Sequence, residues 1–299
     1  EPLTKTEAGI IKMLDTLTQA PVFKKFTNTA NFIGTGYLNV GNYRIGPWMN
    51  WVSSNGWEGL RLRFDLSTNR HFNKKFVLHT YLAYGFKDQK LKGMADVFFL
   101  PRKDPREYIY VSYTNDLDWG QSYYGDVSQD NIFTLAVRKK GVPVKNIKVE
   151  EKKLEFFKEI APWMSARLTL NHKQTLPLRN LVPIDSFATI VGDPLKTFEV
   201  SFRLRFAYLE NFLENHFYRT SLGSPYPIGE LMVSQGFPRV FKSSYRYTKI
   251  TASISDYMKI PPFGTLNWRV FAGRTFGKLP YTILDIAPGN ELYYYNSFA

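Results

Sequence analysis

The sequence predicts an all-β protein: an antiparallel transmembrane β-barrel, incomplete in this chain, with a short N-terminal amphipathic helix. Three observations predict this class. Apolar and polar residues alternate with a period of two over most of the chain, which is typical of strands with two different faces. Aromatic residues make up 16% of the sequence, and mean hydropathy is low at −0.29. No apolar run approaches the ~20 residues of a membrane-spanning helix.

The composition limits the kinds of binding partner and chemistry that we expect for this chain. The 299 residues carry a net charge of +13, which favours an acidic partner such as anionic lipid, lipopolysaccharide phosphate or nucleic acid, although a solvated basic surface has the same composition. A barrel favours outer-membrane lipid or lipopolysaccharide, and we expect no nucleic acid partner. Cysteine is absent, which excludes a disulfide framework, a thiolate metal site and a cysteine nucleophile.

The first residues have helical periodicity. Thr4 and Glu7 form a capping box, and Ile10, Leu14 and Leu17 then fall on one helical face. We expect Pro21 to end this helix, so residues 1–25 are predicted to be a helix and linker and residues 26–299 to be barrel strands. The surface that the helix covers is left open: the barrel mouth, its lumen or a separate N-terminal domain.

From about residue 30 the period changes from 3.6 to 2, and about thirteen strand candidates follow, many close to the ~9–11 residues that cross a bilayer at a tilt. In a soluble fold the apolar face would form the core, whereas in a membrane barrel it meets lipid. So many strands would close a sheet too wide for side chains to fill, and aromatic residues gather at the strand ends, so we favour the membrane. The clearest alternating segments are 60–66, 76–84, 164–171, 198–208 and 266–273.

One set of charges recurs opposite the apolar rows. In a membrane barrel these arginines would face the lumen, where they could favour anions or hold an acidic plug. Paired with Glu58, Asp65 and Glu199, they could equally form a ladder of salt bridges that stiffens the wall. The predicted lumen-facing residues are Arg61, Arg63, Arg167, Arg203, Arg205 and Arg269.

The sequence contains only weak matches to catalytic or metal-binding motifs. His71, His79, His172 and His216 lack metal-site spacing, and the segment from Asp116 to Gly120 resembles a calcium loop without its distal glutamate. A hydrolytic pair of His172 with Ser165 or Ser201 has no supporting motif. We therefore expect no catalytic residues, no metal and no cofactor.

Several segments carry a family resemblance: EPLTKTE (1–7), WEGLRLRF (57–64), TYLAYGFKD (80–88), QGFPRVFK (235–242), GRTFGKLPY (273–281) and PGNELYYYNSFA (288–299). In this order they resemble a family of outer-membrane β-barrels of unknown function from Bacteroidetes-type bacteria. Members usually carry an N-terminal carboxypeptidase-regulatory-like β-sandwich, which is missing here, and they continue into further strands beyond Ala299. The "carboxypeptidase" in that label describes a fold and implies no peptidase activity.

The resemblance implies a location in the bacterial outer membrane and a non-enzymatic role, structural or transport-related, in a larger envelope assembly with other envelope proteins. Two alternatives remain open. The first is an assembly or translocation factor similar to BamA-like barrels, of whose Arg-Gly-Phe loop the segment Gln235-Gly-Phe-Pro-Arg is a faint echo. The second is an outer-membrane lipid hydrolase.

Overall fold

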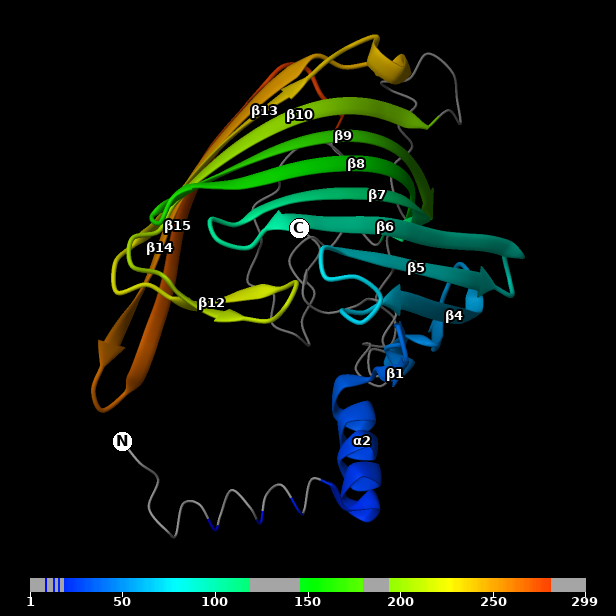
Figure 1. Ribbon diagram of the computed structural model, residues 1–299. Coiled ribbons are helices and arrows are strands. Elements are labelled where there is room, and N and C mark those ends of the chain that lie inside the picture. Colours follow the sequence, from blue (N-terminus) through cyan, green and yellow to red (C-terminus); the bar gives the residue numbers. More distant parts are fainter. Residues whose placement is uncertain are drawn as a thin grey trace.

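A computed structural model describes residues 20–118, 146–179 and 194–280, together with the helical residues 9, 13, 16 and 19. It contains one 13-stranded antiparallel sheet and a separate two-stranded hairpin, so the predicted all-β antiparallel class is confirmed. The sheet arches over a concave side (Figure 1). Among the described residues its edges are β1 and β15, and no described helix has the length and hydrophobicity to cross a membrane.

The chain runs through the sheet in order, and each long strand pairs with the next one, except that β10 pairs with β13. The strands of the sheet are β1 (Leu38–Val40), β2 (Tyr43–Ile45), β3 (Val52–Asn55), β4 (Gly59–Thr68), β5 (Phe76–Gly85), β6 (Lys90–Arg102), β7 (Glu107–Asp118), β8 (Asn146–Ala161), β9 (Met164–Arg179), β10 (Leu195–Phe206), β13 (Ile228–Gly236), β14 (Tyr247–Ile260) and β15 (Gly264–Phe276). The hairpin consists of β11 (Asn211–Glu214) and β12 (Arg219–Gly223), and two short 3₁₀ turns are η1 (Trp48–Asn50) and η3 (Val240–Lys242).

The N-terminal segment differs in part from the prediction. Residues 9, 13, 16 and 19 are helical and Ala20 is not, so a first helix ends just before Pro21, as expected. A second helix that was not expected, α2 (Pro21–Thr35), begins at Pro21, and the boundary expected at residue 25 lies inside it. Proline is tolerated there because the first helical N–H groups have no intrahelical partner. The helix ends at Gly36, whose φ of 80° is the left-handed conformation that glycine adopts readily. Thr4, Glu7, Ile10, Leu14 and Leu17 lie outside the described residues.

Burial along the strands is the reverse of that in a soluble protein. On β4, Arg61 and Asp65 are 1% and 0% exposed, whereas Leu62 and Phe64 are 44% and 53% exposed. The same alternation continues on β5, where Tyr81 and Ala83 are buried and Leu82 is exposed. Charged residues are almost never buried in soluble proteins unless they are paired, and large exposed apolar patches mark a surface that meets another apolar phase. The period-two pattern of the sequence therefore describes two chemically different faces of the sheet.

The two ends of the sheet also differ. The connections β4–β5, β6–β7, β8–β9 and β14–β15 lie at one end, which we call the short-turn end, and span residues 69–75, 103–106, 162–163 and 261–263. β2 pairs with the last residues of β4, so α2 enters the sheet at this end. At the opposite end, β5 connects to β6 through residues 86–89, β7 to β8 through 119–145, β9 to β10 through 180–194 and β13 to β14 through 237–246. The connection 207–227, between β10 and β13, is the exception at the short-turn end, because it is long.

Candidate functional site

The polar face of the sheet is the candidate site, and the strand register places all six predicted arginines on it. Directly opposite residues in an antiparallel pair share a face. From β4 to β10 one such row of partners is Asp65, Tyr81, Met94, Thr114, Glu151, Lys173 and Thr197. Arg61 and Arg63 share this face on β4, as do Arg167 on β9 and Arg203 and Arg205 on β10. From Arg205 the face continues through Glu230 and Ser253, and Arg269 lies opposite Ser255.

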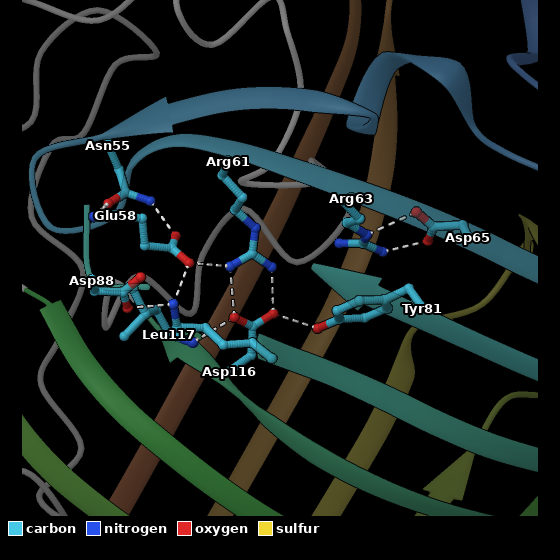
Figure 2. A network of polar contacts seen from close by, with 10 residues as sticks. Asn55, Glu58, Arg61, Arg63, Asp65, Tyr81, Asp88, Asp116 and Leu117 are labelled. Carbon is cyan, nitrogen blue, oxygen red and sulfur yellow. Dashed lines mark hydrogen bonds and ion pairs between the residues drawn. The ribbon is translucent and has the colours of Figure 1, made fainter. Parts of the chain in front are cut away.

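Arg61 is the centre of a buried network (Figure 2). Its guanidinium donates to Glu58 at 2.8 Å and to both carboxylate oxygens of Asp116 at 2.8 and 2.7 Å. Asp116 also accepts the Tyr81 hydroxyl at 2.6 Å. Lys92 donates to Glu58 at 2.6 Å, so each buried charge of this group has a partner of opposite sign.

A contact in this network between two strands that are not neighbours shows that the sheet is curved. Arg61 is on β4 and Asp116 on β7, with β5 and β6 between them. Adjacent strands are ~4.8 Å apart, so β4 and β7 would be separated by ~14 Å in a flat sheet, and side chains standing perpendicular to it would not meet. Their contact at 2.7 Å requires the side chains to converge, so the polar face is the concave one in this region.

A second group lies beside the first on the same face. Arg63 pairs with Asp65 at 2.6 Å, and its guanidinium carbon lies 3.6 Å from the centre of the Tyr81 ring. His79 lies between two carboxylates, with Nδ1 2.8 Å from Asp96 and Nε2 3.6 Å from Asp65. Of the three carboxylates suggested as partners of the arginines, Glu58 pairs with Arg61 and Asp65 with Arg63, whereas Glu199 accepts hydroxyl groups from Ser201 and Tyr247.

The other four arginines, which we call the arginine row, are less completely compensated. Arg205 donates to both oxygens of Glu210 at 2.5 and 2.6 Å. Glu230 is shared, because Arg205 approaches it at 3.4 Å and Arg269 at 3.6 Å. Glu155 is shared in the same way by Lys153 and Arg167, both at 3.4 Å. The arginine row consists of Arg167, Arg203, Arg205 and Arg269.

The polar face is therefore divided by charge. Over β3–β7 the ion-paired groups are four basic side chains and five carboxylates: Arg61, Arg63, Lys92 and His79 with Glu58, Asp65, Asp88, Asp96 and Asp116. Over β8–β15 the arginine row and Lys153 are five cations, and their carboxylates are Glu155, Glu210 and Glu230. Among these described groups the basic excess is confined to the second half of the face.

The hairpin β11–β12 covers the short-turn end of the polar face, and sequence reasoning missed it. Phe217, at its tip, is buried against Val77 and Leu100, which lie on β5 and β6 of that face. Arg106 donates to the Phe217 carbonyl at 2.5 Å, and Arg219 forms ion pairs with Glu159 and with Glu214. Figure 1 shows the hairpin below the arch of the sheet. The length of the connection 207–227, the one long connection described at this end, was a signal that it contains an additional element.

Electrostatics fix the base of the hairpin. Burial raises the pKa of the Glu210 carboxyl, but hydrogen bonds from Arg205 and Ser221 outweigh burial, so this pKa lies below its usual value. Glu210 lies in the connection between β10 and β11 and is therefore held as a carboxylate against the arginine row. The hairpin is thus anchored by Glu210 at its base and by Phe217 at its tip.

The structure does not assemble the hydrolytic pair. His172 lies on the opposite face of β9 from Ser165, and Ser201 faces Thr169 on the polar side. The His172 ring instead contacts Phe241, with its Nδ1 3.0 Å from the Thr197 carbonyl. The segment that resembles a calcium loop is described only as far as residue 118. The Asp116 carboxylate accepts hydrogen bonds from Arg61 and Tyr81. Within the described ranges no three acidic, histidine or cysteine side chains form a metal-binding group.

The segment Gln235-Gly-Phe-Pro-Arg is not a loop tip. Gln235 and Gly236 are the last residues of β13, and the Gln235 amide donates to the carbonyls of Gly236 and Tyr247. The segment thus forms the end of β13 and the start of the connection to β14.

Comparison with protein families matches residues 170–290 to the C-terminal domain of a family of unknown function, DUF5686. The match contains Arg203, Arg205 and Arg269, together with the hairpin. No curated protein matches the sequence. The expected relation to Bacteroidetes-type proteins and to an N-terminal β-sandwich domain stays a prediction.

Among solved structures, the chain is similar to a crystal structure of BamA from Haemophilus ducreyi lacking POTRA domains 1–3. The two share 9% sequence identity with a TM-score of 0.46, and the similarity covers 81% of this chain. The chain spans 42% of the length of that structure.

Replacing Arg61 with methionine should lower the free energy of unfolding by about 3–5 kcal/mol, because Glu58 and Asp116 lose a buried counter-charge. The double variant Arg61→Met/Asp116→Leu should cost less than the sum of the two single changes, since it removes both charges. Urea titration in detergent micelles measures these values, and Arg269→Met, on an exposed side chain, is the matched control with an expected cost of about 0–1 kcal/mol. Additive, mild effects would contradict the description of the network as a buried, coupled unit.

Phe217→Ala should release the hairpin, because it removes the ring that packs on Val77 and Leu100, a loss worth about 3–5 kcal/mol for a buried phenylalanine. We expect trypsin to cut the folded protein at Arg219 at least about tenfold faster than in the unsubstituted chain. Leu222→Ala, at an exposed position of the same hairpin, should leave this rate unchanged. Equal cleavage of both variants would show that Phe217 does not hold the hairpin.

Proposed function

We propose that this chain forms the membrane-embedded wall of a bacterial outer-membrane β-barrel, with a structural or transport-related role among other envelope proteins. The observation that carries the proposal is the exposed apolar face opposite a buried charged face. Leu82, Val111, Phe202, Leu231 and Val270 stand on five different strands of this apolar face and are all exposed. An apolar surface of this extent is favourable only against another apolar phase, and lipid contacts every strand of a barrel equally.

The ends of the sheet suggest an orientation. Bacterial outer-membrane barrels have short periplasmic turns and longer extracellular loops. By this rule the short-turn end of the sheet faces the periplasm and the opposite end faces outward. Helix α2 and the hairpin then lie on the periplasmic side, which is where a preceding domain or another envelope protein would meet the chain.

The polar face is better suited to a structural wall or a gated pore than to an open pore. The Arg61 network fills this face with paired charges over β3–β7, and the hairpin covers it at the short-turn end. Salt bridges of this kind stiffen the wall, because Arg61, Glu58 and Asp116 are each held by more than one side chain. Transport through the barrel would require displacement of the hairpin, so a structural role is the first expectation and gated transport the second.

Substitutions on β7 test the proposal with a matched pair. Val111 is exposed on the apolar face, and Val111→Arg near mid-strand should cost about 2–4 kcal/mol of folding free energy in phospholipid vesicles. Thr114 lies on the polar face opposite Glu151, so Thr114→Arg should be tolerated. Folding is followed by heat-modifiable mobility in gel electrophoresis and by urea titration. Equal tolerance at the two positions, or a larger cost at Thr114, would refute the membrane assignment.

A further inference from the structure

Arg203 is the member of the arginine row without a counter-charge. Within the described part of the chain, its recorded polar contact is with the Met232 sulfur, 3.7 Å from Nη2. Its side chain is half-buried near the C-terminal end of β10. A guanidinium stays charged at any physiological pH, so its charge must be met by water or by an anion.

The neighbours of Arg203 increase the positive potential. Arg167 lies directly opposite it across the β9–β10 pair, and like charges in this position destabilise a sheet. Glu155 does not cancel the charge of Arg167, because Lys153 shares that carboxylate. Arg205, two residues along β10, is already compensated by Glu210. A bound anion near Arg203 would therefore relieve a repulsion that the described side chains leave in place.

A cavity of about 450 Å³ lies between Arg203 and Arg269 on the same face. One row across the strands places Arg203 beside Met232 and Thr251. The next row holds Glu230, Ser253 and Phe271. Arg269 reaches in from β15 and donates to the Ser253 hydroxyl at 3.1 Å. Two guanidinium groups and two hydroxyl groups thus line one space, which is of the usual size for a small-molecule site.

We propose that this cavity is a binding site for a small organic phosphate, an assignment that rests on the proposed barrel. Arginine forks match phosphate oxygens with two parallel hydrogen bonds, and hydroxyl groups supply further donors. Met232 and the exposed ring of Phe271 offer an apolar surface for the organic part. Glu230 also lines the cavity and repels an anion, but its charge is shared by Arg205 and Arg269. Because the cavity is on the polar face, we assign a soluble phosphate and not a membrane lipid.

Isothermal titration with phenyl phosphate, on the full chain folded in dodecyl maltoside, tests this site. We expect binding to the unsubstituted protein and at least about tenfold weaker binding to Arg203→Met. Arg70→Met, which removes an exposed arginine from the β4–β5 turn, should bind as the unsubstituted protein does. Arg269→Met is the second variant, in case Arg203→Met does not fold, and we expect it to weaken binding about three- to tenfold.

Three results would overturn the proposal: no binding of phenyl phosphate to the folded protein, affinity within twofold after either site substitution, or equally tight binding of benzyl alcohol, which lacks the charge. Tighter binding of dihexanoyl phosphatidate than of phenyl phosphate would overturn the assignment to a soluble ligand. Membrane insertion of the same samples is measured in parallel by heat-modifiable mobility. Loss of phosphate binding with normal insertion refutes the site alone, whereas failed insertion refutes the barrel.

Discussion

The central strands of the large sheet, most clearly β4 and β5, bury polar and charged side chains on one side and leave apolar side chains uncovered on the other. This constraint sets the rest of the structure. A shift of one residue in register would carry Arg61 and Asp65 to the apolar face and Leu62 and Phe64 to the polar one. The ion pairs on the concave side therefore fix the register, and the register in turn keeps the apolar face continuous from strand to strand. The ion pairs that stabilise this sheet therefore also determine which side chains each face exposes.

The two halves of the polar face meet the constraint in different ways. Over β3–β7 most of the charges are buried, and Arg61, Glu58 and Asp116 are each held by more than one partner, so this half is extensively cross-linked. Over β8–β15, two carboxylates are each shared by two cations, and Arg203 has none. Low dielectric makes an uncompensated charge costly, so this half is open to anions in a way that the first half is not. The hairpin bridges the two halves, since its tip packs on β5 and β6 and its base pairs with Arg205 on β10.

Local patterns predicted most of the fold. Strand alternation depends on neighbours two residues apart, so the strands and the two faces could be identified from sequence. Glu58 and Asp65 could also be named as possible partners of the arginines, but not which arginine each would contact. The contact between Arg61 and Asp116 joins residues 55 positions apart and depends on the curvature of three strand pairs, which no short window contains. The hairpin escaped prediction because its burial depends on Phe217 reaching Val77 across the sheet. Helix α2 was missed because proline can both follow the end of one helix and begin the next.

The direct test of the central claim is to determine which face of a strand meets lipid. Since the chain has no cysteine, single cysteines can be placed at residues 198–205 of β10, labelled with a nitroxide and reconstituted in vesicles. Electron paramagnetic resonance then compares access by oxygen, which concentrates in lipid, with access by a water-soluble nickel chelate. We predict that the even-numbered positions, such as Val200 and Phe202, favour oxygen and that the odd-numbered positions, such as Ser201 and Arg203, favour nickel. Accessibility without a period of two, or with the opposite phase, would contradict the account.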